Sequence, residues 1–238
     1  MTLKTIATGS SGNCHALISE NEILLLDLGI TAKEIKREID YRISDVVGAV
    51  VTHRHGDHSK SVKSFDDMGM PVFKPYDGME SMLLKNCDFT IKAFDLTDKS
   101  GNWMHTNADG KECPCYGFLI EHPDMGKLLY ITDTELVKWR FNGINHILIS
   151  CNYQSKYIEE SGAKRNHVLR GHMELETVKQ FVMANKTNTL RNVMLCHMSE
   201  ENADPMECVQ EVKGVAGAGV NVDYARPGFE VELSEFPF

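Results

Sequence analysis

The order of hydrophobic and polar residues along the chain predicts strands and helices that follow one another without a long linker. Short aliphatic runs bounded by Gly, Ser and Asn are typical of strands, and apolar residues at helical spacing are typical of helices. The pattern predicts strands over residues 3–7, 15–19, 23–27, 44–52, 71–75, 89–96, 116–121, 127–132, 144–149 and 192–196, with more near the C-terminus. It predicts helices over residues 31–39, 60–68, 78–84, 175–185 and 205–213. This alternation is typical of an α/β fold, and 238 residues fit one large domain or two small ones. We expect a single domain over residues 1–238.

Residues 97–115 interrupt this alternation with a long polar segment rich in Asp, Asn, Gly and Lys. Long loops in compact domains are more often functional than idle. Trp103 and Met104 within it are either walls of an apolar substrate pocket or core residues. We therefore expect this segment to contribute to a site.

Composition and charge narrow the functional classes. Hydrophobic residues make up 42% of the chain and charged residues 25%, as in ordinary globular proteins. The 25 Lys and Arg against 34 Asp and Glu give a net charge of −9, which argues against a protein that grips long nucleic acid by neutralising phosphates. The basic stretch over residues 164–170 is either a local nucleic-acid contact or a solvated turn and helix end.

Cysteine usage and hydropathy indicate where the protein works. The seven cysteines form an odd set without a repeated framework, so we expect a reducing interior rather than a disulfide scaffold. Residues 1–20 lack the charged and apolar regions of a signal peptide, and no apolar run reaches the roughly 18 residues that span a bilayer. We expect a cytoplasmic protein with no membrane partner.

The densest chemical signal is the run His53-Arg54-His55-Gly56-Asp57-His58, directly after an apolar strand. Three imidazoles and a carboxylate occur within six residues. These groups suit zinc, manganese or iron(II), and the absence of cysteine argues against a structural thiolate site. The alternative is a polar turn that is rich in histidine by chance. We favour a metal site.

This run has the H-x-H-x-D-H pattern of the metallo-β-lactamase superfamily, and the chain resembles that superfamily over most of its length. Residues 24–29 resemble its early strand that ends in a structural Asp, residues 130–134 its strand with a bridging carboxylate, and residues 195–199 its strand with the last histidine ligand. The resemblance implies a four-layer αββα sandwich, in which two mixed β-sheets carry helices on their outer faces.

The resemblance also implies two divalent metal ions, with zinc favoured and manganese as the alternative. The implied ligands are His53, His55, Asp57, His58, Asp133 and His197. The first two bind one ion and the next two bind the other. The second aspartate bridges both ions, and the last histidine completes the second site.

The third ligand of the first ion is open between two residues. Superfamily members have a histidine after the strand that here ends near Leu96, where this chain has Asp98 and then the long loop. His105 is the nearest later imidazole, and we favour it because a three-histidine shell is the commoner arrangement. Cys113 and Cys115 lie close by in sequence, but this pair holds too few ligands for its own site and more simply starts a strand.

Two residues are candidates for catalysis. Two cations a few ångströms apart lower the pKa of a bridging water, and Asp57 can orient the resulting hydroxide. The leaving group then needs a proton, and His172 resembles the active-site histidine of ribonuclease Z-like members. The alternatives are His167 in the same role, or a His172 that packs over the core at a helix start. No carboxylate partner for His172 is evident at residues 151–154.

Residues 9–13, Gly-Ser-Ser-Gly-Asn, form a candidate substrate-binding turn. Small residues let backbone amides approach a phosphate, and Ser10, Ser11 and Asn13 can add donors, with His172 as a further substrate contact. Most such stretches are simply tight turns. Together with the metal-binding run, this one resembles the ribonuclease Z-like and WalJ-like branch, which favours phosphodiester substrates.

The predicted function is metal-dependent hydrolysis of a phosphodiester in a nucleotide substrate. The negative charge favours a cyclic mononucleotide, as in compact phosphodiesterases of this architecture, some of them phage-encoded to defeat cyclic-nucleotide immunity in the host cytoplasm. The alternative within the branch is a single-stranded DNA or RNA exonuclease of the WalJ or ribonuclease Z type. A lactonase or thioesterase of small metabolites and a non-catalytic binding protein are the alternatives from other classes. The resemblance also implies a homodimer.

Overall fold

The computed structural model describes residues 1–84, 86–107, 109–158 and 171–234, which form two compact units. Both units are assembled from segments that lie far apart in the sequence. The first comprises Met1–Ala93, Ile120–Gly126 and Ala225–Phe238, and the second comprises Phe94–Leu119 and Lys127–Tyr224. The single domain over residues 1–238 stays a prediction.

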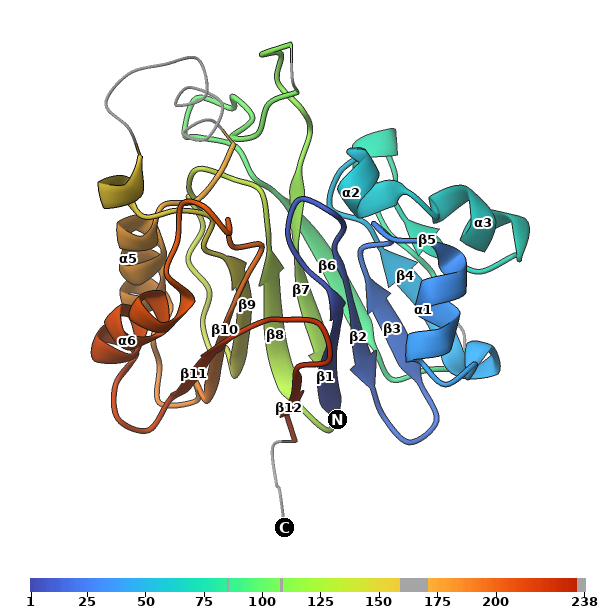
Figure 1. Cartoon of the computed structure of the whole chain (residues 1–238). Helices are drawn as coiled ribbons and strands as arrows, with labels where there is room; N and C mark the ends of the chain where they lie inside the picture. The colour runs from blue at the N-terminus through green and yellow to red at the C-terminus, as the bar shows by residue number, and fades with distance from the viewer. Residues whose placement is uncertain (85, 108, 159–170, 235–238) are drawn as a thin grey trace. The chain divides into compact units, whose positions relative to one another are not determined.

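A six-stranded mixed sheet forms the centre of the first unit (Figure 1). Its strands, in the order β12-β1-β2-β3-β4-β5 across the sheet, are β12 (Glu230–Glu232), β1 (Thr2–Ala7), β2 (Cys14–Ile18), β3 (Ile23–Leu26), β4 (Val46–Val50) and β5 (Val72–Phe73). The pairs from β12 to β3 are antiparallel, whereas β3, β4 and β5 pair in parallel. The carboxyl ends of β3 and β4 therefore lie at the same edge of this sheet.

The first helix of this unit begins at a local signal. Helix α1 (Ala32–Glu38) is preceded by a capping box, in which the Thr31 hydroxyl accepts the Glu34 N–H and the Glu34 carboxylate accepts the Thr31 N–H. Two backbone donors of the first turn are satisfied in this way. These bounds confirm the helix predicted over residues 31–39.

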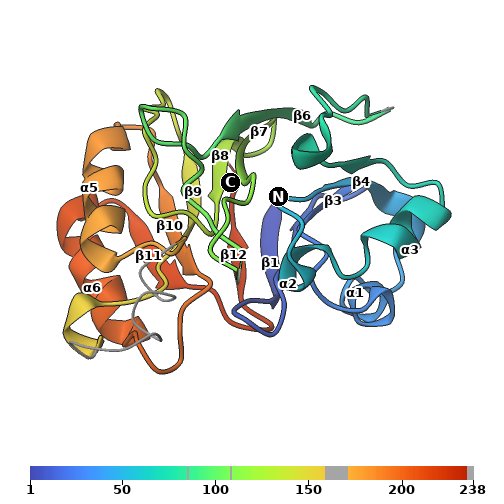
Figure 2. The same ribbon diagram turned by 90° about the horizontal axis from the view of Figure 1, so that it is seen from above.

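A buried apolar layer joins the helices of the first unit to its sheet. Ile35 of α1 and Phe65 of α3 (Val62–Asp67) pack in one core with Leu25 of β3, and all three are fully buried. Figure 2 shows α1 and α3 on the same side of β3 and β4. The remaining short elements of this unit are α2 (Gly56–Ser59) and the 3-10 turns η1 (Ile43–Asp45) and η2 (Pro75–Asp77).

The second six-stranded sheet has the order β11-β10-β9-β8-β7-β6. Its strands are β6 (Thr90–Asp95), β7 (Tyr116–His122), β8 (Gly126–Ile131), β9 (His146–Ser150), β10 (Asn192–Cys196) and β11 (Asn221–Tyr224). Strands β8 to β11 pair in parallel. Parallel strands end at one edge of a sheet, so the residues that follow β8, β9 and β10 are brought together there.

Two helices cover one face of these parallel strands, as Figures 1 and 2 show. Val178 and Val182 of α5 (Leu175–Asn185) and Val212 of α6 (Pro205–Ala216) share a buried core with the strands. Asp204 caps α6, because its carboxylate accepts the N–H groups of Met206 and Glu207. A further 3-10 turn, η3 (Ser155–Tyr157), follows β9.

The helix predicted over residues 78–84 is wrong, because this segment has no regular secondary structure. A Cβ on Gly48 of β4 would lie 2.9 Å from Leu84 and 3.5 Å from Met82. Side chains two residues apart therefore meet the same strand, which is the spacing of an extended segment rather than of a helix. Packing against β4 has overridden the local helical pattern.

The long loop over residues 97–115 contains two isolated antiparallel bridges, Thr97 with Trp103 and Thr106 with Glu112. The Trp103 ring lies against Tyr116, with 5.1 Å between ring centroids. Of the two alternatives for Trp103, this contact favours the core-packing role over the pocket wall.

Two expectations from composition can be compared with the structure. The seven cysteines, all among the described residues, form no disulfide. Within the described part of the chain, no helix combines the length and the apolar character that a membrane span requires.

Candidate metal centre

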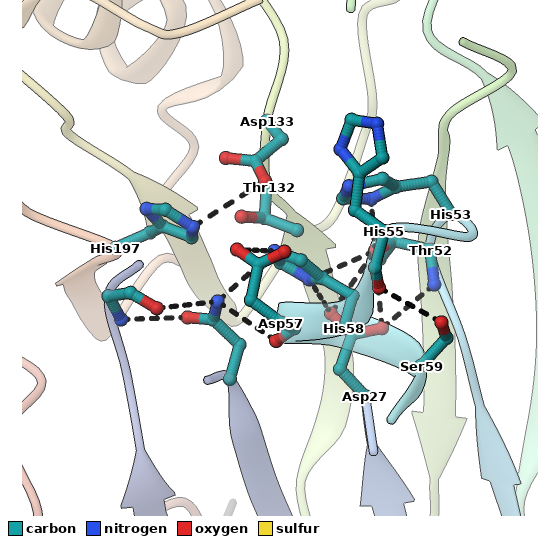
Figure 3. A network of polar contacts seen from close by, with 12 residues as sticks. Asp27, Thr52, His53, His55, Asp57, His58, Ser59, Thr132, Asp133 and His197 are labelled. Carbon is teal, nitrogen blue, oxygen red and sulfur yellow. Dashed lines mark hydrogen bonds and ion pairs between the residues drawn. The ribbon is translucent and has the colours of Figure 1, made fainter. Parts of the chain in front are cut away.

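The histidine-rich run lies in the first unit, where it follows β4 and continues into α2, the short helix that contains Asp57 and His58. His53 and His58 are fully buried, whereas His55 and Asp57 are partly exposed. The ring centroids of His53 and His55 lie 4.7 Å apart, and those of His53 and His58 lie 4.3 Å apart. His58 Nε2 lies 3.5 Å from the Asp57 carboxylate. Four predicted ligands therefore converge in this unit (Figure 3).

Asp27, the residue after β3, holds this cluster in place (Figure 3). Its fully buried carboxylate accepts the Thr52 N–H at 2.8 Å and the Thr52 hydroxyl at 3.1 Å. The same carboxylate accepts His58 Nδ1–H at 2.7 Å. The Asp27 N–H donates to the Val50 carbonyl at 2.9 Å, which joins the ends of β3 and β4. The metal-binding loop is thus tied to a neighbouring strand.

These hydrogen bonds decide which ring nitrogens can bind a metal. A carboxylate only accepts, so His58 donates through Nδ1 and carries its lone pair on Nε2. The Thr52 hydroxyl gives its proton to Asp27 and accepts from His53 Nδ1 at 3.1 Å, so His53 also carries its lone pair on Nε2. Metal-binding histidines commonly have this arrangement, with the other ring N–H given to an acceptor of the protein. One buried carboxylate therefore presets two predicted ligands.

We expect Asp27→Asn to weaken metal binding by about 10- to 100-fold, the usual cost of losing a hydrogen-bond partner behind a metal ligand. The amide presents an N–H where Thr52 or His58 now donates, so the tautomer of His58 is no longer fixed. Asp40→Asn is the matched control, because Asp40 is exposed and shares the left-handed backbone, with φ 52° against 58° for Asp27. Competition with a chelating dye measures both affinities, and equal values in the two variants would contradict this role.

The turn over residues 9–13 lies beside His58 in the first unit. Asn13 is 1% exposed, and its side chain accepts the Gly9 N–H at 2.9 Å and donates to the Gly9 carbonyl at 3.0 Å. Its Nδ2 lies 3.1 Å from His58 Nε2, whose lone pair accepts this donor. Both serines of the turn are exposed. Asn13 therefore closes the turn against the metal-binding loop, and the substrate role of the turn stays a prediction.

Gly29 lets this turn and the metal-binding loop approach closely. Its N–H donates to the Asn13 carbonyl at 2.9 Å, and the Asn13 N–H donates to the Asp57 carbonyl at 2.7 Å. A Cβ on Gly29 would lie 1.7 Å from the Asp57 carbonyl oxygen and 2.6 Å from the Asn13 nitrogen. Glycine is required here by space.

The second unit brings Asp133 and His197 together where its parallel strands end. Asp133 follows β8, His197 follows β10, and the two are 2% and 5% exposed. An Asp133 oxygen lies 3.5 Å from His197 Nε2 (Figure 3). Both residues have a left-handed backbone, with φ 48° and 50°, as does Asp27. Such strain costs about 1–3 kcal/mol for each residue and concentrates at functional sites, so it marks these strand ends.

Asn152, after β9, orients His197. Its Oδ1 accepts the Met173 N–H at 2.8 Å, so its Nδ2 faces His197, 2.9 Å from the carbonyl oxygen and 3.2 Å from Nδ1. An amide N–H donates, so His197 Nδ1 accepts and the neutral ring carries its proton on Nε2. Metal binding through Nε2 requires that proton to leave this nitrogen. His197 is thus less prepared for a metal than His53 and His58.

The two candidates for the third ligand make different contacts. His105 is 4% exposed and donates through Nδ1 to the Gly171 carbonyl at 3.0 Å, so it carries its lone pair on Nε2. Asp98 accepts the N–H groups of Ser100 and Asn102 within its own turn. The hydrogen bond from the Asn102 side chain holds the pKa of Asp98 below its usual value. Asp98 is therefore engaged within its own turn, and His105 as the third ligand stays a prediction.

His172 lies among the candidate ligands of the second unit. Its ring centroid is 6.3 Å from that of His105 and 6.3 Å from that of His197. It is partly exposed, which suits contact with a substrate. The competing His167 and the basic stretch over residues 164–170 lie outside the described residues.

A third group of potential ligands, in the first unit, was not anticipated from the sequence. Glu22, Asp88 and His122 offer ligand atoms within 4.8 Å of one another. The Asp124 N–H donates to His122 Nδ1 at 3.1 Å, so the neutral ring carries its proton on Nε2, 3.7 Å from Glu22. The Glu22 carboxylate accepts the Asp88 N–H at 3.2 Å. We assign this group to polar pairing rather than to a metal, because Asp88 is exposed and exposed acidic groups are common without an ion.

The residues that orient the predicted ligands were missed from the sequence. Thr52, Asn152 and Gly171 belong to no motif, and only their position beside a histidine or a strand end singles them out. Their hydrogen bonds to Asp27, Met173 and His105, respectively, join residues far apart in the sequence, so pattern reasoning had no means to find them.

Comparison with known proteins agrees with this fold and this chemistry. Residues 7–68 match the family model of the metallo-beta-lactamase superfamily. Exodeoxyribonuclease YycJ of Bacillus anthracis is 26% identical over 225 residues, which cover 83% of this chain and 82% of that protein. Exodeoxyribonuclease WalJ of Streptococcus pneumoniae serotype 2 is 26% identical over 247 residues, which cover 92% of this chain and 90% of that protein.

Among solved structures, the metallo-beta-lactamase fold protein YhfI from Bacillus subtilis has a TM-score of 0.66 at 13% identity and covers 97% of this chain and 99% of that one. Two mixed six-stranded sheets with flanking helices are the metallo-β-lactamase fold, so the predicted fold is confirmed. The histidine and aspartate clusters are consistent with divalent metal binding. The chain therefore has the metallo-β-lactamase fold, and the exodeoxyribonucleases YycJ and WalJ are its distant relatives.

Proposed function

We propose that this protein is a metal-dependent phosphodiesterase that hydrolyses nucleic-acid strands from their ends. The metal requirement is supported by the hydrogen bonds that leave a lone pair on Nε2 of His53, His58 and His105. The substrate class is supported by one observation, the similarity to two exodeoxyribonucleases over 83% and 92% of the chain.

We assign two ions to the ligands that the superfamily implies. The proposed ligands are His53, His55 and His105 for one ion, Asp57, His58 and His197 for the other, and Asp133 for both. Imidazole nitrogens and carboxylate oxygens suit zinc and manganese. His197 must move its proton from Nε2 to Nδ1 to bind a metal, which costs the hydrogen bond from Asn152 Nδ2.

Two of the chain's own groups complete the chemistry. Divalent ions supply a nucleophile near neutral pH and Lewis acidity toward a phosphate oxygen. The Asp57 carboxylate, 3.5 Å from His58 Nε2, is placed to orient an attacking water and accept its proton. His172, partly exposed between His105 and His197 in ring contacts, is placed to give a proton to the leaving oxygen.

The net charge of −9 is compatible with strand ends as the substrate. Binding along a duplex needs many phosphate contacts, whereas a strand end needs few. The same charge supports the second candidate, a cyclic mononucleotide, which offers one phosphate. The similarity to two exodeoxyribonucleases favours nucleic-acid strand ends over a cyclic mononucleotide as the substrate. Neither candidate substrate depends on the expected homodimer.

The test is a comparison of substrates with chelator-stripped protein before and after zinc or manganese is restored. The substrates are end-labelled single-stranded DNA, a cyclic mononucleotide, bis-(p-nitrophenyl) phosphate and a nitrophenyl carboxylic ester. We expect progressive shortening of the DNA from one end, and only after metal is added.

Each other outcome selects another function. Cleavage of the cyclic mononucleotide without DNA shortening would select the second candidate. Cleavage of only the carboxylic ester would select a lactonase or thioesterase. Less than one transition metal ion per chain, unchanged in His197→Ala, would reject the two-metal site and leave a binding protein.

A further inference from the structure

The segment that carries His172 also holds His105. The carbonyl of Gly171 accepts His105 Nδ1–H at 3.0 Å, and the Gly171 N–H donates to a Glu135 carboxylate oxygen at 3.0 Å. The Glu135 N–H donates to the Met104 carbonyl at 3.1 Å. Glu135 is therefore bonded both to the residue before His105 and to the residue that His105 contacts. All of these residues belong to the second unit.

Gly171 occupies a position that no other residue fits. Its φ of +80° lies in the left-handed region, and a Cβ there would lie 2.5 Å from His105 Nδ1 and 3.2 Å from the Thr106 nitrogen. His105 is 4% exposed, so its ring has little room to yield. A side chain at Gly171 must displace either the ring or the carbonyl that accepts from it.

We propose that Gly171 and Glu135 are positioning residues for His105. The Gly171 carbonyl only accepts, so this hydrogen bond keeps the His105 proton on Nδ1 and the lone pair on Nε2, the nitrogen that would bind a metal. The Glu135 carboxylate accepts the Gly171 N–H and so keeps the Gly171 carbonyl within hydrogen-bond distance of the His105 ring. This inference rests on the proposed function, in which His105 is a metal ligand. Because Gly171 and His172 share a peptide bond, one segment then positions both a ligand and the proton donor.

Gly171→Ala tests the inference, with Gly110→Ala as the matched control. Gly110 lies in the same unit with the same φ of +80°, and a Cβ there meets nothing within 4 Å. Long-range proton–nitrogen NMR on metal-free protein reads the tautomer of His105. We expect the Nδ1–H tautomer in wild type and in Gly110→Ala, and its loss in Gly171→Ala. Zinc affinity should fall by about 10- to 100-fold in Gly171→Ala alone.

A second pair of variants avoids the strained backbone. Glu135→Gln keeps an acceptor oxygen for the Gly171 N–H, whereas Glu135→Ala removes it. We expect Glu135→Gln to keep the Nδ1–H tautomer and the zinc affinity of wild type, and Glu135→Ala to lose both. A wild-type tautomer in Glu135→Ala would overturn the role of Glu135.

The experiments distinguish a failure of this inference from a failure of the proposed function. The same His105 tautomer and zinc affinity in Gly171→Ala and Gly110→Ala would overturn the inference, even in a protein that binds two ions and shortens DNA. A wild type that binds no metal would instead overturn the proposed function, and with it the inference, whatever the tautomer.

Discussion

Asp133→Asn should lower metal-dependent kcat/KM by about 10³-fold or more, which corresponds to about 4 kcal/mol of transition-state stabilisation. The substitution keeps the size of the side chain, and Asn tolerates the left-handed backbone at φ 48°, so the fold should survive. It removes the one negative charge that we propose both ions share. Metal content by mass spectrometry and kcat/KM for bis-(p-nitrophenyl) phosphate measure the two effects.

Asp204→Asn is the control for this experiment. Asp204 caps α6 in the same unit through two backbone N–H groups, and Asn caps helices as well as Asp does. We expect its metal content and kcat/KM to match wild type. The proposed bridging role is wrong if Asp133→Asn behaves in the same way.

Gly29→Ala should destabilise the protein by about 3 kcal/mol or more, because overpacked sites cost about 1–3 kcal/mol and this contact is severe. The added methyl would lie 1.7 Å from the Asp57 carbonyl oxygen and 2.6 Å from the Asn13 nitrogen. Both atoms belong to the main chain, so no flexible side chain can move aside to relieve the contact. Urea unfolding of metal-free protein measures the loss without any contribution from bound ions.

Gly56→Ala is the matched control, since Gly56 precedes Asp57 and a Cβ there meets nothing within 4 Å. Gly56 is the first residue of α2, where Ala favours the helix. We expect its free energy of unfolding to equal or slightly exceed that of wild type. A Gly29→Ala protein as stable as Gly56→Ala would show that the backbone around Asp57 can move to accept the methyl group. The close approach at Gly29 would then not contribute to stability.

Local signals were sufficient for much of the fold. The helix at residues 31–39 could be predicted because Thr31 and Glu34 cap it and its apolar face has helical spacing. The helix predicted at residues 78–84 failed because Met82 and Leu84 lie against Gly48, some 35 residues earlier in the chain by sequence number. Elements with their own start signals were predictable, and a segment shaped by a distant strand was not.

The types of ligand were readable from the sequence, since imidazoles and a carboxylate crowd into residues 53–58 after an apolar strand. The sequence by itself also determined the α/β alternation and a choice between His105 and Asp98. Only the tertiary structure decided which ring nitrogen of each histidine carries the lone pair. The deciding hydrogen bonds join residues far apart, 31 positions between Asp27 and His58 and 66 between His105 and Gly171. A tautomer follows from its partner in space, and that partner exists only after the chain has folded.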